Sequence, residues 1–147
     1  MRRALGDGFE LDDDPARIDR AAVHAYVGGE SYWARGRSRE RQDELIERSD
    51  RVVGLFHEER QIGFARAVDC EAAGFVYLAD VYVLEEFRGR GLGVVLVREI
   101  VERGPFVERR WVLHTRDMHG LYAKFGFGPN ERLMERSVSS RHEAAGT

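Results

Sequence analysis

The chain has 147 residues, of which 43% are hydrophobic and 33% charged, and a net charge of −3 at pH 7. This length predicts one domain that buries its own core. This charge argues against a nucleic-acid-binding domain, which normally has a clustered basic face and a high pI, so we expect no nucleic-acid partner. Cys70 is the single cysteine, which excludes an intrachain disulfide. No stretch reaches the ~20 apolar residues that span a bilayer, so we expect a cytoplasmic protein without a membrane partner.

The N-terminal part predicts an edge strand and a helix. Residues 5–11 form the short strand, which three acids and a proline end. Asp19 is a good N-cap for the helix, whose apolar residues recur at helical spacing until Gly28 and Gly29 end it.

A second, more polar helix follows. Ser38 is its expected N-cap, and the helix covers residues 39–48. Most of its positions are charged, so we expect it to bury only Leu45 and Ile46 and to expose the rest.

From residue 52 the pattern changes to strands. Residues 52–56 and 61–68 are apolar runs on either side of the polar turn 57–60, which predicts an antiparallel hairpin. Residues 74–84 then form the longest and most apolar run. We expect this strand at the centre of the sheet, with both faces covered.

A glycine-rich segment follows this strand, with the sequence Arg88-Gly89-Arg90-Gly91-Leu92-Gly93. The helix after it has a broad apolar face and ends before Gly104-Pro105. Residues 111–114 form the next strand, and a strand–helix–strand connection implies a right-handed parallel crossover.

The C-terminal part predicts two further elements and a tail. Asp117 is the expected cap of a short helix over residues 121–125, which Gly126 ends. Residues 132–138 form the last strand. Residues 139–147 are polar, and we expect a disordered tail there after a single domain over residues 1–138.

The glycine-rich segment is suited to binding a phosphate, because glycine lets the backbone approach an anion and the first N–H groups of a helix point at it. A nucleotide-hydrolysing P-loop requires a lysine that this loop lacks. A dinucleotide-binding fold requires Gly-x-Gly-x-x-Gly after the first strand of a βαβ unit, whereas this loop follows an antiparallel meander. The remaining pattern is Arg/Gln-x-x-Gly-x-Gly/Ala, which residues 88–93 match at every specified position.

With this pattern the chain resembles the GNAT superfamily of N-acetyltransferases, in which the loop binds the pyrophosphate of acetyl-coenzyme A. Residues 121–127, Leu-Tyr-Ala-Lys-Phe-Gly-Phe, resemble the second signature of the family. The resemblance implies an α/β (α+β) fold: a mixed sheet in which an antiparallel meander leads into a β-α-β crossover, with helices on both faces. The chain departs from the family at Thr115, where many members carry an asparagine.

The resemblance also implies a site for acetyl-coenzyme A as co-substrate, with no metal. The expected cofactor-binding residues are the end of the strand and the whole glycine-rich segment: Val81, Tyr82, Val83, Arg88, Gly89, Arg90, Gly91, Leu92 and Gly93. Tyr122 is the expected catalytic residue beside the sulfur, where its phenol stabilises or protonates the leaving thiolate. His114 and His119 lack the spacing of a zinc motif, so we expect structural roles for them.

Asp80 is the second catalytic candidate. Strict alternation puts it on an apolar face of its strand, where desolvation would raise its pKa toward that of a general base. The resemblance also implies a bulge in this strand, and an acid that caps the backbone irregularity at the bulge is an equally good interpretation of Asp80. Tyr32 and Trp33 either line the acceptor site or simply cover the core.

The sequence therefore predicts an N-acetyltransferase that moves an acetyl group from acetyl-coenzyme A to a primary amine by direct attack, without a covalent enzyme intermediate. The acceptor is a small molecule or a peptide, and a homodimer is compatible with the resemblance. Two alternatives stay open: a non-catalytic acyl-coenzyme A sensor or partner-binding module, and transfer of a longer acyl group.

Overall fold

The computed structural model describes residues 1–138, which fall into two compact units, Met1–Asp117 and the segment from Met118 onward. The tail that we expected to be disordered, residues 139–147, lies outside the described residues. The first unit contains one six-stranded sheet in which the strands follow one another in sequence order.

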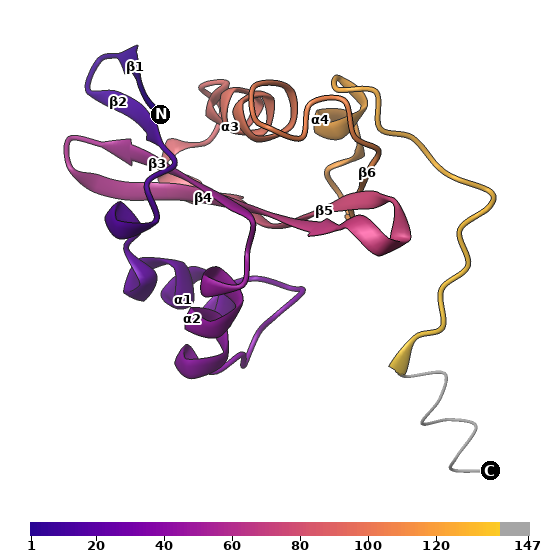
Figure 1. The fold of residues 1–147 in the computed structure, drawn as a ribbon. Coiled ribbons are helices and arrows are strands. Elements are labelled where there is room, and N and C mark those ends of the chain that lie inside the picture. The colour runs from indigo at the N-terminus through magenta and orange to yellow at the C-terminus, as the bar shows by residue number, and fades with distance from the viewer. Residues whose placement is uncertain (139–147) are drawn as a thin grey trace. The chain divides into compact units, whose positions relative to one another are not determined.

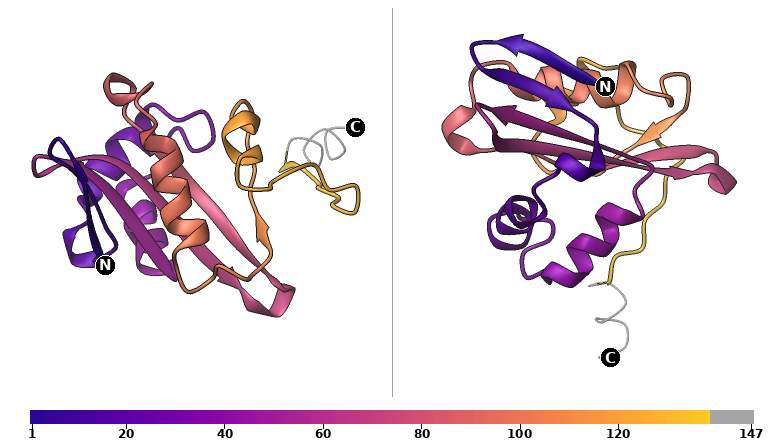
Figure 2. Two further views of the ribbon diagram at one scale, coloured as in Figure 1. Left: turned by 90° about the horizontal axis from the view of Figure 1, so that it is seen from above. Right: turned by 60° about the vertical axis from the view of Figure 1, so that its left-hand side comes forward.

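The strands and helices of the first unit, in chain order, are β1 (Arg2–Gly6), β2 (Phe9–Asp12), η1 (Pro15–Arg17), α1 (Arg20–Gly29), α2 (Arg39–Glu47), β3 (Arg51–His57), β4 (Arg60–Cys70), η2 (Glu71–Ala73), β5 (Phe75–Val83), η3 (Glu85–Phe87), α3 (Leu92–Glu102) and β6 (Trp111–Val112). Helices α1 and α2 cover one face of the sheet and α3 covers the other (Figures 1 and 2). Strands β1 to β5 are antiparallel to their neighbours, and β6 is parallel to β5. The meander, the crossover and the helices on both faces are therefore as predicted.

The N-terminal strand prediction is wrong in its form. Residues 5–11 contain the turn of a hairpin, because β1 ends at Gly6 and β2 begins at Phe9. Asp7 and Gly8 between them both have positive φ, 52° and 81°. A Gly-Asp-Gly sequence is suited to such a left-handed turn. The prediction of one continuous strand did not take this turn into account.

The centre of the sheet is β4, and β5 lies next to the edge. β4 has 11 residues, most of them buried, between β3 and β5. On its other side β5 pairs with β6 at only two positions, Val76 with Trp111 and Tyr77 with Val112. The expected central position of β5 is therefore wrong, because the strand that should cover its outer edge is so short.

The helix caps that the sequence predicts are present. The Asp19 carboxylate accepts a hydrogen bond from the Ala22 N–H at 3.0 Å, and the Ser38 hydroxyl accepts one from the Arg41 N–H at 3.1 Å. In α2 the buried residues are Gln42 and Ile46. Gln42 thus takes the buried position that we expected for Leu45.

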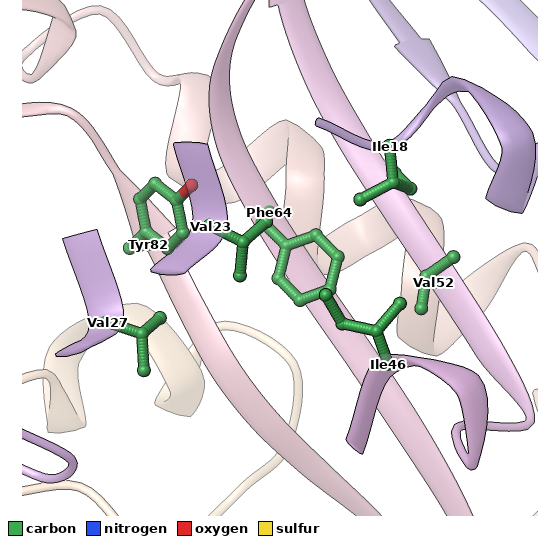
Figure 3. Close-up of a cluster of buried hydrophobic side chains, with 7 residues drawn as sticks. All are labelled: Ile18, Val23, Val27, Ile46, Val52, Phe64 and Tyr82. Carbon is green, nitrogen blue, oxygen red and sulfur yellow. The ribbon is translucent and has the colours of Figure 1, made fainter. Parts of the chain in front are cut away.

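Figure 3 shows the core between the sheet and the helices α1 and α2. The buried cluster comprises Ile18, Val23, Val27, Ile46, Val52, Phe64 and Tyr82. On the opposite face α3 buries the apolar side predicted for it: Leu92, Leu96, Val97, Ile100 and Val101. Each helix therefore packs on the sheet along one apolar stripe.

An ion-pair cluster fixes α3 to the sheet. Glu99, 1% exposed, accepts a hydrogen bond from Arg3 at 2.7 Å. The Arg51 guanidinium donates to the backbone carbonyl of Glu99 at 2.8 Å and lies 3.4 Å from its carboxylate. A buried carboxylate with two guanidinium partners satisfies the rule that charges inside proteins are paired.

The second unit begins with α4 (His119–Ala123). Its N-cap is Met118, without a side-chain hydrogen bond, so the prediction of Asp117 as the cap is wrong. The helix is followed by Gly126, whose φ is 85°, and the predicted strand over residues 132–138 is absent.

Candidate active site

A β-bulge in β5 is the central feature of the candidate site. Phe64 pairs with Tyr82, but Arg66 pairs with Ala79, so Asp80 and Val81 together lie opposite a single residue of β4. Asp80 has a φ of 53°, in the left-handed region that Asp tolerates better than most residues. The extra residue bends the strand and redirects the side chains that follow it.

The bulge changes which residues share a face of the sheet. Directly paired residues lie on the same face, so Ala79 shares the face of Arg66, and Tyr82 shares that of Phe64. Leu78 comes directly before Ala79, so its side chain points to the opposite face, which α3 covers. Strict alternation, on which we placed Asp80 on an apolar face, would put Leu78 and Asp80 on the same face and is therefore wrong here.

The surroundings of Asp80 are polar. Its Oδ1 accepts from the Trp33 indole N–H at 2.8 Å. Its Oδ2 accepts from the guanidinium groups of Arg66 at 2.7 Å and Arg37 at 2.8 Å, and from the Gln42 amide at 3.4 Å. Four donors from α2, β4 and the loop between α1 and α2 thus converge on one carboxylate.

The charge of Asp80 follows from these contacts. Burial alone would raise the pKa of the carboxyl group, but the two guanidinium groups and the indole N–H outweigh it, and the pKa lies below its usual value. The expectation of a raised pKa is wrong, because the arginines were not visible from the strand pattern. A carboxylate held ionised by two arginines is a poor proton acceptor near neutral pH, which argues against a role as general base.

The aromatic residues predicted for the acceptor side lie at this bulge. Trp33 is 39% exposed although its N–H is fixed by Asp80. Tyr32, 42% exposed, packs edge-on against Trp33 with 5.2 Å between ring centroids. Tyr26, which sequence reasoning missed, stacks on Tyr82 at 4.1 Å. Together they form an aromatic wall beside the bulge, and Arg37, Arg66 and Gln42 complete it.

The edge of β5 that faces β6 is open at the bulge. Within residues 1–138 no strand pairs with this edge beyond Tyr77. Val81, Tyr82 and Val83, the predicted backbone contacts for the acyl group, all lie in this unpaired stretch. Alternate residues of a strand point their backbone groups to opposite edges, and the Leu84 N–H donates to the Ile62 carbonyl of β4, so Tyr82 also faces β4. Val81 and Val83 face the open edge, where the Val83 carbonyl accepts a hydrogen bond from Arg88. The Val81 backbone and the Val83 N–H are therefore the groups placed to bind an extended ligand, as a strand would. Tyr82 itself points its side chain into the core on the α1 and α2 face.

The glycine-rich segment connects β5 to α3. Gly89 and Gly91 have φ values of 80° and 76°, and space is open around each. Gly91 is the N-cap of α3, with no side-chain hydrogen bond to the first turn. Leu92 and Gly93 begin that turn, so the loop presents backbone N–H groups that suit the pyrophosphate of acetyl-coenzyme A.

The two arginines of the segment have different surroundings. The Arg88 guanidinium donates to the carbonyl of Val83 at 2.9 Å and to the Tyr26 hydroxyl at 2.8 Å, so it braces the loop against the strand end. Arg90 lies over the Phe87 ring at 5.6 Å and lines a hollow of about 550 Å³ between α3 and the β1–β2 hairpin.

Tyr122 and His114 are the remaining residues that the sequence singled out. Tyr122 belongs to the second unit, where its ring contacts that of Phe127 edge-on at 5.8 Å, and its catalytic role stays a prediction. His114 hydrogen-bonds to the Tyr77 hydroxyl through Nδ1.

Over the described part of the chain, no three His, Cys, Asp or Glu side chains gather as metal ligands. None of its helices has the length and apolar character needed to span a membrane.

Comparison with known proteins identifies the family. Residues 12–127 match the acetyltransferase (GNAT) family, and the chain belongs to it. A solved GNAT-family structure from Xanthomonas campestris is 34% identical, with a TM-score of 0.80 over 90% of this chain and 94% of that one. A Gibberella zeae protein described as an acetyltransferase is 28% identical over 132 residues, 76% of this chain and 74% of the relative.

A more distant structure shares the fold. It is an aminoglycoside N-acetyltransferase in complex with coenzyme A, 19% identical, with a TM-score of 0.64 over 90% of this chain and 95% of that one. The resemblance and the fold class inferred from the sequence are therefore confirmed, and family membership makes this protein an acyltransferase.

Proposed function

We propose that this protein transfers an acetyl group from acetyl-coenzyme A to a primary amine by direct attack. The observation that carries the proposal is the junction of loop and helix, where Gly89 and Gly91 adopt left-handed conformations and leave the first turn of α3 without a side-chain cap. A helix start of this kind binds phosphate groups through its backbone N–H groups. Family membership supplies the reaction class.

Acetyl transfer requires a neutral amine, a donor for the developing oxyanion and a proton for the leaving thiolate. In this proposal the backbone at Val81, on the open edge of β5, binds the thioester carbonyl. The amine nitrogen bonds to the carbonyl carbon, the C–S bond breaks, and the amine proton leaves to water. Since Asp80 is held ionised by arginines, the amine reaches the site in its neutral form without that carboxylate as base.

Tyr122 is the proposed partner of the leaving thiolate. A phenol with a pKa of about 10 and a thiol with a pKa of about 8.5 differ by roughly 2 kcal/mol in proton affinity. A hydrogen bond from the phenol to the thiolate is therefore sufficient during C–S cleavage. The phenol proton passes to sulfur as coenzyme A leaves, and the phenolate takes back from water the proton that the amine released.

Calorimetric titration with coenzyme A tests the binding step, and thiol release from acetyl-coenzyme A with an amine panel tests the reaction. Gly91→Glu should abolish binding, because it strains the loop and puts a carboxylate where the pyrophosphate lies. Gly74→Glu is the matched control, since Gly74 has a φ of 83° and open space around it at the other end of β5. Intact coenzyme A binding by Gly91→Glu would refute the proposal.

Two outcomes would replace it. Coenzyme A binding with thioester hydrolysis that no amine accelerates would identify a non-catalytic sensor. A higher kcat/KM with butyryl-coenzyme A than with acetyl-coenzyme A would identify transfer of a longer acyl group.

A further inference from the structure

The wall beside the bulge contains more positive than negative charge. Asp80 is the single carboxylate at the centre, with its side chain 1% exposed, and it pairs with both Arg66 and Arg37, whose side chains are 9% and 20% exposed. One negative charge therefore faces two guanidinium groups, which leaves a local charge of +1 in a largely desolvated setting. Charges in such a setting interact more strongly than on the surface.

Both guanidinium groups have hydrogen-bonding capacity left over. Arg66 donates through Nε to Asp80, its one acceptor within residues 1–138. Arg37 donates through a single terminal nitrogen, to Asp80 and to Gln42. Within residues 1–138, Nε2 of Gln61 is the only fully buried side-chain nitrogen or oxygen without a hydrogen-bond partner. The spare nitrogens of Arg66 also make no hydrogen bond, so they are not fully buried and a ligand can contact them. A guanidinium group has five N–H donors, and most of them are uncommitted here.

Neighbouring groups strengthen this charge. Arg88 donates to the Tyr26 hydroxyl at one side of the wall, and the Arg116 guanidinium lies 4.0 Å from the centre of the Tyr32 ring. Asp117, 3.6 Å from Arg116, offsets the charge of that arginine, so Arg88 is the neighbour that adds to the positive charge. Three of the four acids of α2 are paired with arginines: Asp43 with Arg39, Glu44 with Arg41 and Arg48, and Glu47 with Arg20 of α1. Within residues 1–138 the fourth, Glu40, has no ion pair, and it is exposed. The wall is thus cationic in a chain whose net charge is −3.

We propose that the acceptor amine carries an oxyanion, a carboxylate or a phosphate, which binds the spare nitrogens of Arg66 and Arg37. This inference rests on the proposed function and names its substrate class. Guanidinium groups bind both oxyanions in a planar, two-bonded arrangement. A polyamine or another multiply charged cation would meet like charge at the same wall and is disfavoured.

Trp33 gives the second determinant of the acceptor. Its N–H is held by Asp80, so the indole ring is fixed while 39% of the residue stays exposed. A fixed aromatic ring beside an anion-binding pair suits a small amine with an apolar part close to its oxyanion. A hydrophobic amino acid combines these features, and a small amino phosphate carries the same oxyanion chemistry.

Two matched pairs of acceptors test the inference. We expect a KM for phenylalanine at least tenfold below that for phenylalaninamide, or the same for phosphoethanolamine against ethanolamine. The pair with the larger ratio identifies the oxyanion as carboxylate or phosphate. Arg66→Gln and, separately, Arg37→Gln should remove this preference while leaving coenzyme A affinity unchanged.

Arg39→Gln, which removes an exposed ion pair with Asp43, is the control and should keep the preference. Arg37→Gln also covers the case in which Arg66→Gln fails to fold, because Arg37 is the more exposed partner. An equal or lower KM for the amine that lacks the oxyanion, in both pairs, would overturn the inference. An unchanged preference in folded Arg66→Gln would also overturn it.

Binding of products separates this inference from the proposed function. N-acetylphenylalanine should bind the coenzyme A complex at least tenfold more tightly than N-acetylphenylalaninamide. If no amine is acetylated but this preference holds, the proposed function is refuted and the oxyanion site stands. If amines are acetylated but the amide binds as tightly, the reverse is true.

Discussion

The substitution Asp80→Asn tests the ion-pair network at the bulge most directly. Asparagine keeps the size of the side chain and tolerates the positive φ of 53° at this position. It removes the charge that two guanidinium groups share, and its amide can offer only one oxygen to donors that now approach both. The effect is therefore electrostatic and is not caused by backbone strain.

The magnitude follows from the burial of the carboxylate. Asp80 is 5% exposed, and its four donors lie within 3.4 Å. Breaking a buried ion pair costs about 3–5 kcal/mol when one charge is left without a partner. Because Arg37 is partly exposed and water can solvate it, we expect a loss of about 3 kcal/mol in the free energy of unfolding. For a chain of this size that corresponds to a fall in Tm of about 10 °C.

Urea denaturation followed by Trp fluorescence and circular dichroism measures this loss. Asp43→Asn is the control, since it removes an exposed pair with Arg39 and should cost at most about 0.5 kcal/mol. The lowered pKa of Asp80 means that its stabilising effect is complete above the unfolded value of about 3.9 and is lost as pH falls through the folded value. The difference between wild type and Asp80→Asn should therefore be full at pH 7 and shrink below about pH 4.

Two results would refute this reasoning. Equal stability of Asp80→Asn and Asp43→Asn at pH 7 would show that the network contributes nothing. An acidic limb near neutral pH in the kcat/KM profile that disappears in Asp80→Asn would show that Asp80 is a general base after all.

Three further substitutions test other parts of the structure. Tyr122→Phe should lower kcat about 10- to 100-fold at nearly unchanged coenzyme A affinity in calorimetry; a large loss of affinity would assign Tyr122 to binding. Glu99→Gln should cost about 3 kcal/mol in urea denaturation, whereas Glu102→Gln, which loses only an exposed pair, should cost at most about 0.5 kcal/mol, and equal losses would contradict the role of the α3 cluster. Gly54→Ala should cost about 1–3 kcal/mol, because the added Cβ would lie 2.6 Å from the Phe56 ring, and a variant as stable as wild type would show that the ring moves aside freely.

The sequence determined those features that depend on neighbours along the chain. Asp19 and Ser38 cap their helices because an N-cap bonds to an N–H two or three residues ahead. The apolar face of α3 and the glycine-rich segment before it were readable from spacing alone, because both depend on local helical geometry. These local features, taken in order, were also sufficient to indicate the family.

The tertiary structure decided the surroundings of Asp80. A single extra residue at the bulge changed the face to which the strand directs its side chains, and the alternation of apolar and polar residues did not show that change. The partners that set the charge, Arg66 and Arg37, lie 14 and 43 residues away along the chain. The sequence could therefore place an acid in the right strand, but only the packing of α2 and β4 against the bulge determined that this acid is an anion between arginines.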